Sequence, residues 1–159
     1  TAYEIPKRDW SSDVCSSDLN QDITKKYRYV ATLDTRTSAI CRALDGREFE
    51  YGKGPMPPQH FNCRSTTVPI IDPDILPPSK TATRASKDGQ VPINESYGQW
   101  LAKQSTATKA QALGASKVAY FDKLANKYGP KEAIAKLVRD DGSELTLDQL
   151  RARYGPTKP

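Results

Sequence analysis

The chain has few of the residues that build a large core, a disulfide framework or a redox centre. Its 159 residues include three Cys, one His and one Met. Hydrophobic residues make up 36% of the chain, and the mean hydropathy is −0.70. No apolar run approaches the roughly twenty residues that cross a bilayer, which excludes a membrane-spanning helix. Three scattered cysteines do not form a disulfide framework and indicate a reducing compartment. We therefore expect a small, basic protein, of net charge +5, with a modest core.

The first nineteen residues differ from the rest of the chain. They show no helical or strand periodicity, and residues 9–19 back-translate to a DNA sequence similar to a common sequencing-library adapter. The alternative is a disordered leader rich in Ser and Asp. We expect residues 1–19 to stand apart from the fold, and the protein proper, beginning near Asn20, to be the C-terminal portion of a longer chain.

Three segments between residues 20 and 71 have the composition of strands. Residues 27–33 (YRYVATL) are rich in aromatic and β-branched residues, and residues 47–51 (REFEY) alternate charged and aromatic side chains. Residues 64–71 (RSTTVPII) are β-rich, with Pro69 restricting them to a sheet edge or a strand end. Residues 52–58 form a Gly/Pro loop that cannot be helical. The pattern predicts an α+β fold with a small antiparallel β-sheet and a Pro-rich loop.

A short helix is predicted between the first two strands. Residues 38–44 are expected to be helical, with Asp34 or Thr35 offering N-cap oxygens. Gly46 falls at the C′ position, where a helix end commonly requires a positive φ.

The second half of the chain changes from a linker to helices. Residues 72–93 are rich in Pro, Ser, Thr and Lys, which predicts a linker or a long surface crossing. Several short helices are expected over residues 94–159, with Asn94 capping the first and Pro130 at the first position of another. Thr146 begins a capping box with Gln149. Apolar stripes predict buried positions at Tyr97, Trp100, Leu101, Val118, Phe121, Ala125, Tyr128, Ile134, Leu137, Val138, Leu147, Leu150 and Tyr154.

The residues best suited to metal binding or catalysis lie between residues 20 and 71. His60 and Cys63 form a His-x-x-Cys pair, Cys41 could be a third zinc ligand and Asp34 a fourth. Structural zinc normally takes four N or S ligands, and three are available here. We prefer the simpler interpretation, in which both thiols pack as small apolar groups, His60 hydrogen-bonds the loop backbone and no cofactor is bound.

The same residues have two other interpretations, a catalytic Cys/His pair and a disulfide. A Cys/His nucleophile pair, with Asp34 orienting the imidazole, would also need an oxyanion site, and any small motif with such residues could be drawn this way. A Cys41–Cys63 disulfide does not suit a reducing cell. We therefore expect that the protein is not an enzyme.

Charged residues crowd the same region and continue into the helices. Arg36 with Asp45, and Arg64 with Asp34, are the ion pairs expected to hold the loops. The helical region carries basic residues that indicate either a solvated face or weak, non-specific contact with double-stranded DNA: Lys109, Lys117, Lys123, Lys127, Lys131, Lys136 and Arg139.

The order and spacing of these motifs resemble the Mu F-like phage head-morphogenesis domain. The resemblance is carried by Tyr29-Val30-Ala31-Thr32-Leu33-Asp34-x-Arg36-Thr37-Ser38, Cys41-x-x-Leu44-Asp45-Gly46, Pro57-Pro58-x-His60-x-Asn62-Cys63-Arg64-Ser65 and Val68-Pro69. Later segments, Ser96-Tyr97-Gly98-x-Trp100-Leu101 and Leu145-Thr146-Leu147-Asp148-x-Leu150, resemble the continuation of such proteins. Some relatives look to have a further Cys near Ser38, which this chain lacks.

The resemblance implies a structural minor head protein of a phage, located in the virion and assembled in the bacterial host cytoplasm. It would act with the portal and with capsid or scaffold proteins in head assembly and in DNA packaging or ejection. The alternative is a zinc-stabilised binding module that contacts DNA non-specifically. The predicted organisation is a leader (1–19), a Mu F-like core motif (20–71), a linker (72–93) and a helical C-terminal region (94–159).

Overall fold

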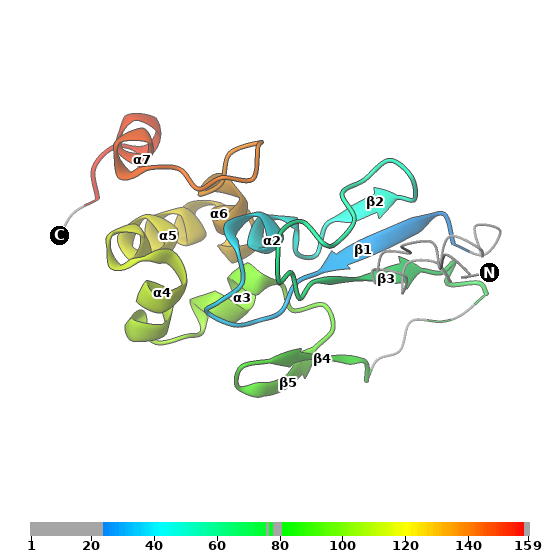
Figure 1. The fold of residues 1–159 in the computed structure, drawn as a ribbon. Coiled ribbons are helices and arrows are strands. Elements are labelled where there is room, and N and C mark those ends of the chain that lie inside the picture. Colours follow the sequence, from blue (N-terminus) through cyan, green and yellow to red (C-terminus); the bar gives the residue numbers. More distant parts are fainter. Residues whose placement is uncertain (1–23, 76, 78–80, 158–159) are drawn as a thin grey trace, which may run out of the picture.

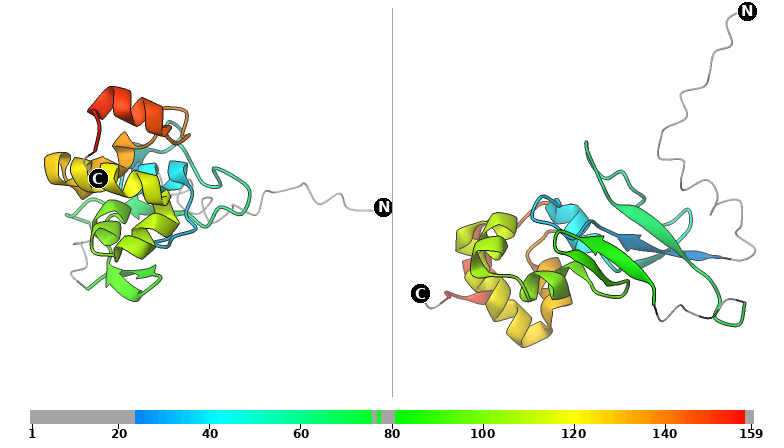
Figure 2. Two further views of the ribbon diagram at one scale, coloured as in Figure 1. Left: turned by 90° about the vertical axis from the view of Figure 1, so that its left-hand side faces the viewer. Right: turned by 90° about the horizontal axis from the view of Figure 1, so that it is seen from below.

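The computed structural model describes residues 24–75, 77 and 81–157. The predicted leader, residues 1–19, therefore lies outside the described residues. Strands occupy one end of the molecule and most helices the other (Figures 1 and 2). The α+β class, with antiparallel sheets and short C-terminal helices, is confirmed.

The main sheet has three antiparallel strands in the order β2-β1-β3, comprising Glu48–Glu50, Lys26–Val30 and Thr66–Ile70. In the central strand, Tyr27 and Tyr29 alternate with more exposed neighbours, and both are fully buried. This period of two places alternate side chains on one face of the sheet. Pro69 lies on β3, an edge strand, as predicted, where a missing N–H is tolerated.

Helix α2 (Ala39–Leu44) connects β1 to β2, close to the predicted bounds. The expected cap is wrong, because Ser38 occupies the N-cap position and its side chain makes no capping hydrogen bond. Asp34 instead accepts a hydrogen bond from the backbone N–H of Arg36 (2.9 Å) and stabilises the preceding turn. Gly46 has a φ of +71°, as predicted, and donates its N–H to the Tyr29 carbonyl (2.8 Å).

A hairpin occupies part of the segment predicted to be a linker. Strands β4 (Thr83–Ser86) and β5 (Gly89–Pro92) pair antiparallel around a short turn. A bridge between Leu33 and Ser86 and a hydrogen bond from Lys87 N to the Leu33 carbonyl (2.8 Å) attach this hairpin to the chain after β1. Composition alone favoured a linker because the hairpin has few large apolar residues. The hairpin is stabilised by backbone hydrogen bonds, which composition does not reveal.

Five helices follow: α3 (Tyr97–Ala102), α4 (Thr106–Leu113), α5 (Ala115–Tyr128), α6 (Pro130–Lys136) and α7 (Leu147–Tyr154). Pro130 begins α6 and Thr146 caps α7 in a full capping box, both as predicted. The predicted Asn94 cap is wrong, since Ser96 forms the capping box of α3 with Gln99. Helix α4 was not predicted separately. Within the described ranges, no helix has the length and apolar character needed to cross a bilayer.

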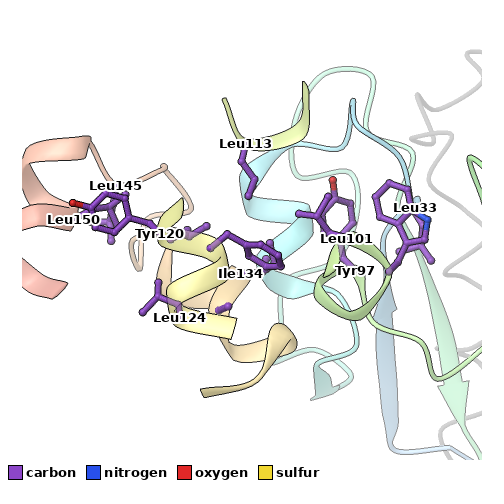
Figure 3. Close-up of a cluster of buried hydrophobic side chains, with 13 residues drawn as sticks. Leu33, Tyr97, Leu101, Leu113, Tyr120, Leu124, Ile134, Leu145 and Leu150 are labelled. Atoms are coloured by element: carbon purple, nitrogen blue, oxygen red, sulfur yellow. The ribbon is translucent and has the colours of Figure 1, made fainter. Parts of the chain in front are cut away.

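The larger core cluster lies among the helices and extends to the strands (Figure 3). Leu33, from the segment after β1, packs in the same cluster as Tyr97 and Leu101 of α3 and Ile134 of α6. Gly98 permits close packing here, because a Cβ at this position would collide with the Pro130 carbonyl. The predicted buried stripes are largely confirmed.

Tyr128 departs from its predicted stripe. It is 41% exposed and lies beneath the ammonium groups of Lys127 and Lys136. The helical spacing is therefore correct as far as Ala125, which packs against the core, but Tyr128 at the end of α5 lies outside it.

Candidate functional site

Cys41, His60 and Cys63 converge beside helix α2. Cys41 lies on α2 and is buried, whereas the other two come from the loop between β2 and β3. The Cys41 Sγ lies 3.3 Å from His60 Nε2 and 3.6 Å from Cys63 Sγ. All three potential ligand atoms are within 4.8 Å of one another. The fold thus brings together three of the four predicted ligands.

The imidazole of His60 is oriented by bonds at both ring nitrogens. Nδ1 is 2.8 Å from the carbonyl oxygen of Phe61, and Nε2 is 2.8 Å from Ser38 Oγ. A carbonyl can only accept, so Nδ1 carries a proton, and in the neutral ring Nε2 presents its lone pair to Ser38 and Cys41. The predicted hydrogen bond from His60 to the loop backbone is therefore present.

Tyr29, on the central strand β1, contacts both cysteines of the cluster. Its hydroxyl lies 3.3 Å from Cys41 Sγ and 4.0 Å from Cys63 Sγ. Burial raises the pKa of Tyr29, so the hydroxyl remains protonated at neutral pH. Sequence reasoning did not assign this residue to the site. The alternation of Tyr27, Tyr29 and Ala31 along one strand face was the signal that could have placed it.

The surroundings of Cys63 favour its thiolate form. Its burial alone would raise the pKa, but backbone hydrogen bonds at Gln59 and Ser65, with further bonds from Ser65 and Cys41 side chains, lower the pKa to about 7. A large share of this group is therefore thiolate at neutral pH, which is the form that binds metals and attacks electrophiles.

Asp34 does not join the cluster. Its carboxylate receives Arg64 through two bonds, Nη1 to Oδ2 at 2.6 Å and Nη2 to Oδ1 at 3.0 Å, and also the Thr37 hydroxyl at 3.0 Å. Burial works to raise the pKa of Asp34, but the bonds from Arg64, the Arg36 backbone and Thr37 lower it overall. The predicted ion pair between Arg64 and Asp34 is present. Asp34, which was suggested as a fourth metal ligand, therefore binds Arg64 instead.

Asp45 has a different partner from the one predicted. Both of its oxygens accept from Arg84, at 2.7 and 3.1 Å, rather than from Arg36. The same carboxylate accepts the backbone N–H groups of Ala31 and Tyr97, each at 2.7 Å. This buried aspartate therefore joins the end of β1, the β4–β5 hairpin and the first turn of α3. No local pattern identified Arg84.

The other motif residues also serve the architecture. Arg42 is buried and reaches out of α2 to the Ala112 carbonyl (2.6 Å) and to Glu144. Arg47 lies over the ring of Phe49. Pro57 and Pro58 are joined by a cis peptide bond within the loop that carries His60 and Cys63.

The basic residues of the helical region have internal contacts. Lys109 pairs with Asp122 (2.8 Å), and Lys117 pairs with Glu144. The remaining predicted residues bond backbone carbonyls, lie over the Tyr128 ring or bond polar side chains: Lys123, Lys131, Lys127, Lys136 and Arg139. These contacts favour the solvated-face interpretation.

The first region is therefore a small module in which charged and sulfur-containing side chains cross-link strand, helix and loop. The model of the family described as Phage Mu protein F like protein matches residues 13–68. The predicted resemblance is confirmed over the motifs in that range, and a role in phage head morphogenesis is the one that this family indicates. The later motifs, from Ser96 onward, lie beyond the matched residues. No curated protein and no solved structure shows significant similarity to the chain.

Proposed function

We propose that the protein is a minor structural component of a phage head, associated with the portal and acting in assembly and in DNA packaging or ejection. The observation that carries this proposal is the match of residues 13–68 to the Mu F-like family. Its partners would be the portal and the capsid or scaffold proteins. It would be located in the virion after assembly in the host cytoplasm.

The use of the motif residues supports a structural role. Asp34 binds Arg64, and Asp45 binds Arg84 and two backbone N–H groups, so both carboxylates are occupied by protein groups. The cavity beside Cys41 and His60 has a volume of about 20 Å³. Ligand pockets are usually on the order of 300 Å³ or more. This arrangement suits a cross-linked scaffold better than a site that turns over a substrate.

A second candidate is a zinc-stabilised module that contacts double-stranded DNA without sequence preference. The convergence of Cys41, His60 and Cys63 favours its metal component. Its DNA component depends on a basic surface whose side chains are largely engaged in internal contacts. A salt-dependent shift of DNA by the purified chain, losing affinity steeply as salt rises, would support it.

Co-expression tests the primary proposal. The chain would be produced with the portal, scaffold and major capsid proteins encoded beside it in the source genome. Prohead-sized particles would then be separated by sedimentation, with and without the portal. We expect the chain to sediment with particles and to be lost from them when the portal is omitted.

Two results would contradict the proposal in different ways. A chain that never sediments with particles would refute a head role. Equal incorporation with and without the portal would refute the portal association alone.

A further inference from the structure

We propose that Cys41, His60 and Cys63 form a zinc site with three protein ligands and a fourth position, beside Ser38, that is filled by water. The site would bind metal whether or not the chain acts in a phage head. It would clip the loop between β2 and β3 to helix α2.

The spacing of the three ligand atoms suits a tetrahedral zinc ion. Zinc–sulfur bonds of about 2.3 Å and zinc–nitrogen bonds of about 2.0 Å place neighbouring ligand atoms roughly 3.5–3.8 Å apart. The two sulfur atoms are 3.6 Å apart, and Cys41 Sγ is 3.3 Å from His60 Nε2. The third separation, between the His60 ring nitrogen and Cys63 Sγ, is no more than 4.8 Å. Metal entry would therefore need a shift of up to about 1 Å between these two side chains.

The surrounding groups orient the ligands in the way a metal requires. The Nδ1–H of His60 donates to the Phe61 carbonyl at 2.8 Å, which leaves Nε2 unprotonated and directed at the cluster. The Tyr29 hydroxyl lies 3.3 Å from Cys41 Sγ, within reach to donate to a metal-bound thiolate. Two thiolates and a neutral imidazole would balance the charge of Zn²⁺, and this soft donor set favours zinc over magnesium or calcium.

A small cavity provides the fourth position. It has a volume of about 20 Å³, and its lining includes Ser38, Cys41 and His60. This is about the space that one water molecule needs. Ser38 Oγ, 2.8 Å from His60 Nε2, would bond this water. Asp34 is excluded as the fourth ligand because Arg64 and Thr37 hold its carboxylate.

The first experiment measures metal content. The full chain would be purified under reducing conditions from zinc-supplemented cells and assayed by elemental analysis, beside Cys63→Ser and His60→Ala. The matched control is Cys15→Ser, which removes a thiol outside the described residues. We expect one zinc ion per chain in the parent and the control, and loss of zinc in the two ligand variants. Circular dichroism would establish which variants retain the parent's secondary structure.

Cobalt substitution reports directly on the identity of the ligand atoms. With Co²⁺ in place of zinc, a tetrahedral thiolate site should show intense visible absorption and a sulfur charge-transfer band, both reduced in Cys63→Ser. Ser38→Cys should supply a fourth soft ligand in place of the water and lower the dissociation constant for zinc in a chelator competition.

Three results would contradict the proposed zinc site. Zinc at far below one ion per chain, or zinc content unaffected by Cys63→Ser in a folded variant, would overturn the site. A Cys41–Cys63 disulfide in the reduced preparation, found by alkylation and mass spectrometry, would also overturn it. A variant that fails to fold leaves the parent's metal content and its cobalt spectrum to decide.

Discussion

Arg84 binds the Asp45 carboxylate with both terminal nitrogens, at 2.7 and 3.1 Å, although the two residues are 39 positions apart. Both side chains are almost fully buried, at 5% and 0% exposure. Arg84 also donates to the carbonyls of Ala31 and Glu95. The β4–β5 hairpin is therefore joined to the Mu F-like motif by a buried charge pair, in which Arg84 Nε is buried without a hydrogen-bond partner.

Asp45→Asn should be strongly destabilising. Neutralising the carboxylate leaves the buried Arg84 charge uncompensated, and breaking a buried pair in this way typically costs about 3–5 kcal/mol. Guanidinium denaturation of the parent and variant would measure the loss. The control is Asp148→Asn, because the Asp148 side chain is 92% exposed and its contact with Arg151 is 3.5 Å long. Equal denaturation midpoints for all three proteins would refute the assigned role.

Gly46→Val should destabilise the end of α2. The positive φ of +71° costs an L-residue about 1–2 kcal/mol, and a β-branched side chain resists it most. Space is not the cause, since a Cβ at Gly46 would have its nearest neighbour, an atom of Lys131, at 3.8 Å. Gly46→Asn should cost less, because Asn tolerates the left-handed region. Valine and asparagine variants of equal melting temperature would argue against a conformational origin.

Thr146→Ala should reduce the free energy of unfolding by about 1 kcal/mol. The Thr146 side chain accepts from the backbone N–H of Gln149, and the Gln149 side chain accepts from the Thr146 backbone N–H at 3.0 Å. Urea denaturation would detect the change as a shifted midpoint with an unchanged slope. Thr146→Ser retains the capping oxygen and should stay close to the parent. An unmoved midpoint for the alanine variant would show that this cap contributes nothing.

Arg64→Met should weaken the fold near neutral pH and much less in acid. The pKa of Asp34 is lowered in the folded chain, so its ion pair stabilises the fold above the unfolded value of about 3.9. That contribution is lost as the pH falls through the lower folded value. Melting temperatures of parent and variant should therefore differ at pH 7 and converge at strongly acidic pH.

The exposed pair between Arg151 and Asp148 is the control for that experiment. Its side chains are 64% and 92% exposed, so Arg151→Met should have little effect at either pH. A difference between parent and Arg64→Met that persists unchanged in strong acid would mean that Arg64 acts through packing and not through Asp34.

Local signals in the sequence predicted much of the fold. Pro130 begins α6, Thr146 caps α7, and Pro69 lies on an edge strand, because each preference depends on a few neighbouring residues. The positive φ of Gly46 belongs to the same class. The Asn94 cap was wrong because Ser96, two residues later, offers a better box with Gln99.

The candidate site was predictable in part. The His60-x-x-Cys63 spacing and the nearby Cys41 identified the three groups that converge. Tyr29 was missed, although strand alternation could have indicated it. Asp34 was suggested both as a zinc ligand and as the partner of Arg64, and it binds Arg64. Whether a carboxylate binds a metal or an arginine depends on which of them the loop brings within reach.

The sequence by itself determined the α+β class, the helix ends that local residues encode, and the motif order that identifies the Mu F-like resemblance. Only the tertiary structure decided that Asp45 binds Arg84, that Arg42 crosses to Glu144, and that Leu33 packs among the helices. The reason is physical: a cap or turn is set by bonds between near neighbours, whereas distant charge pairs and core contacts exist only after the chain has crossed itself.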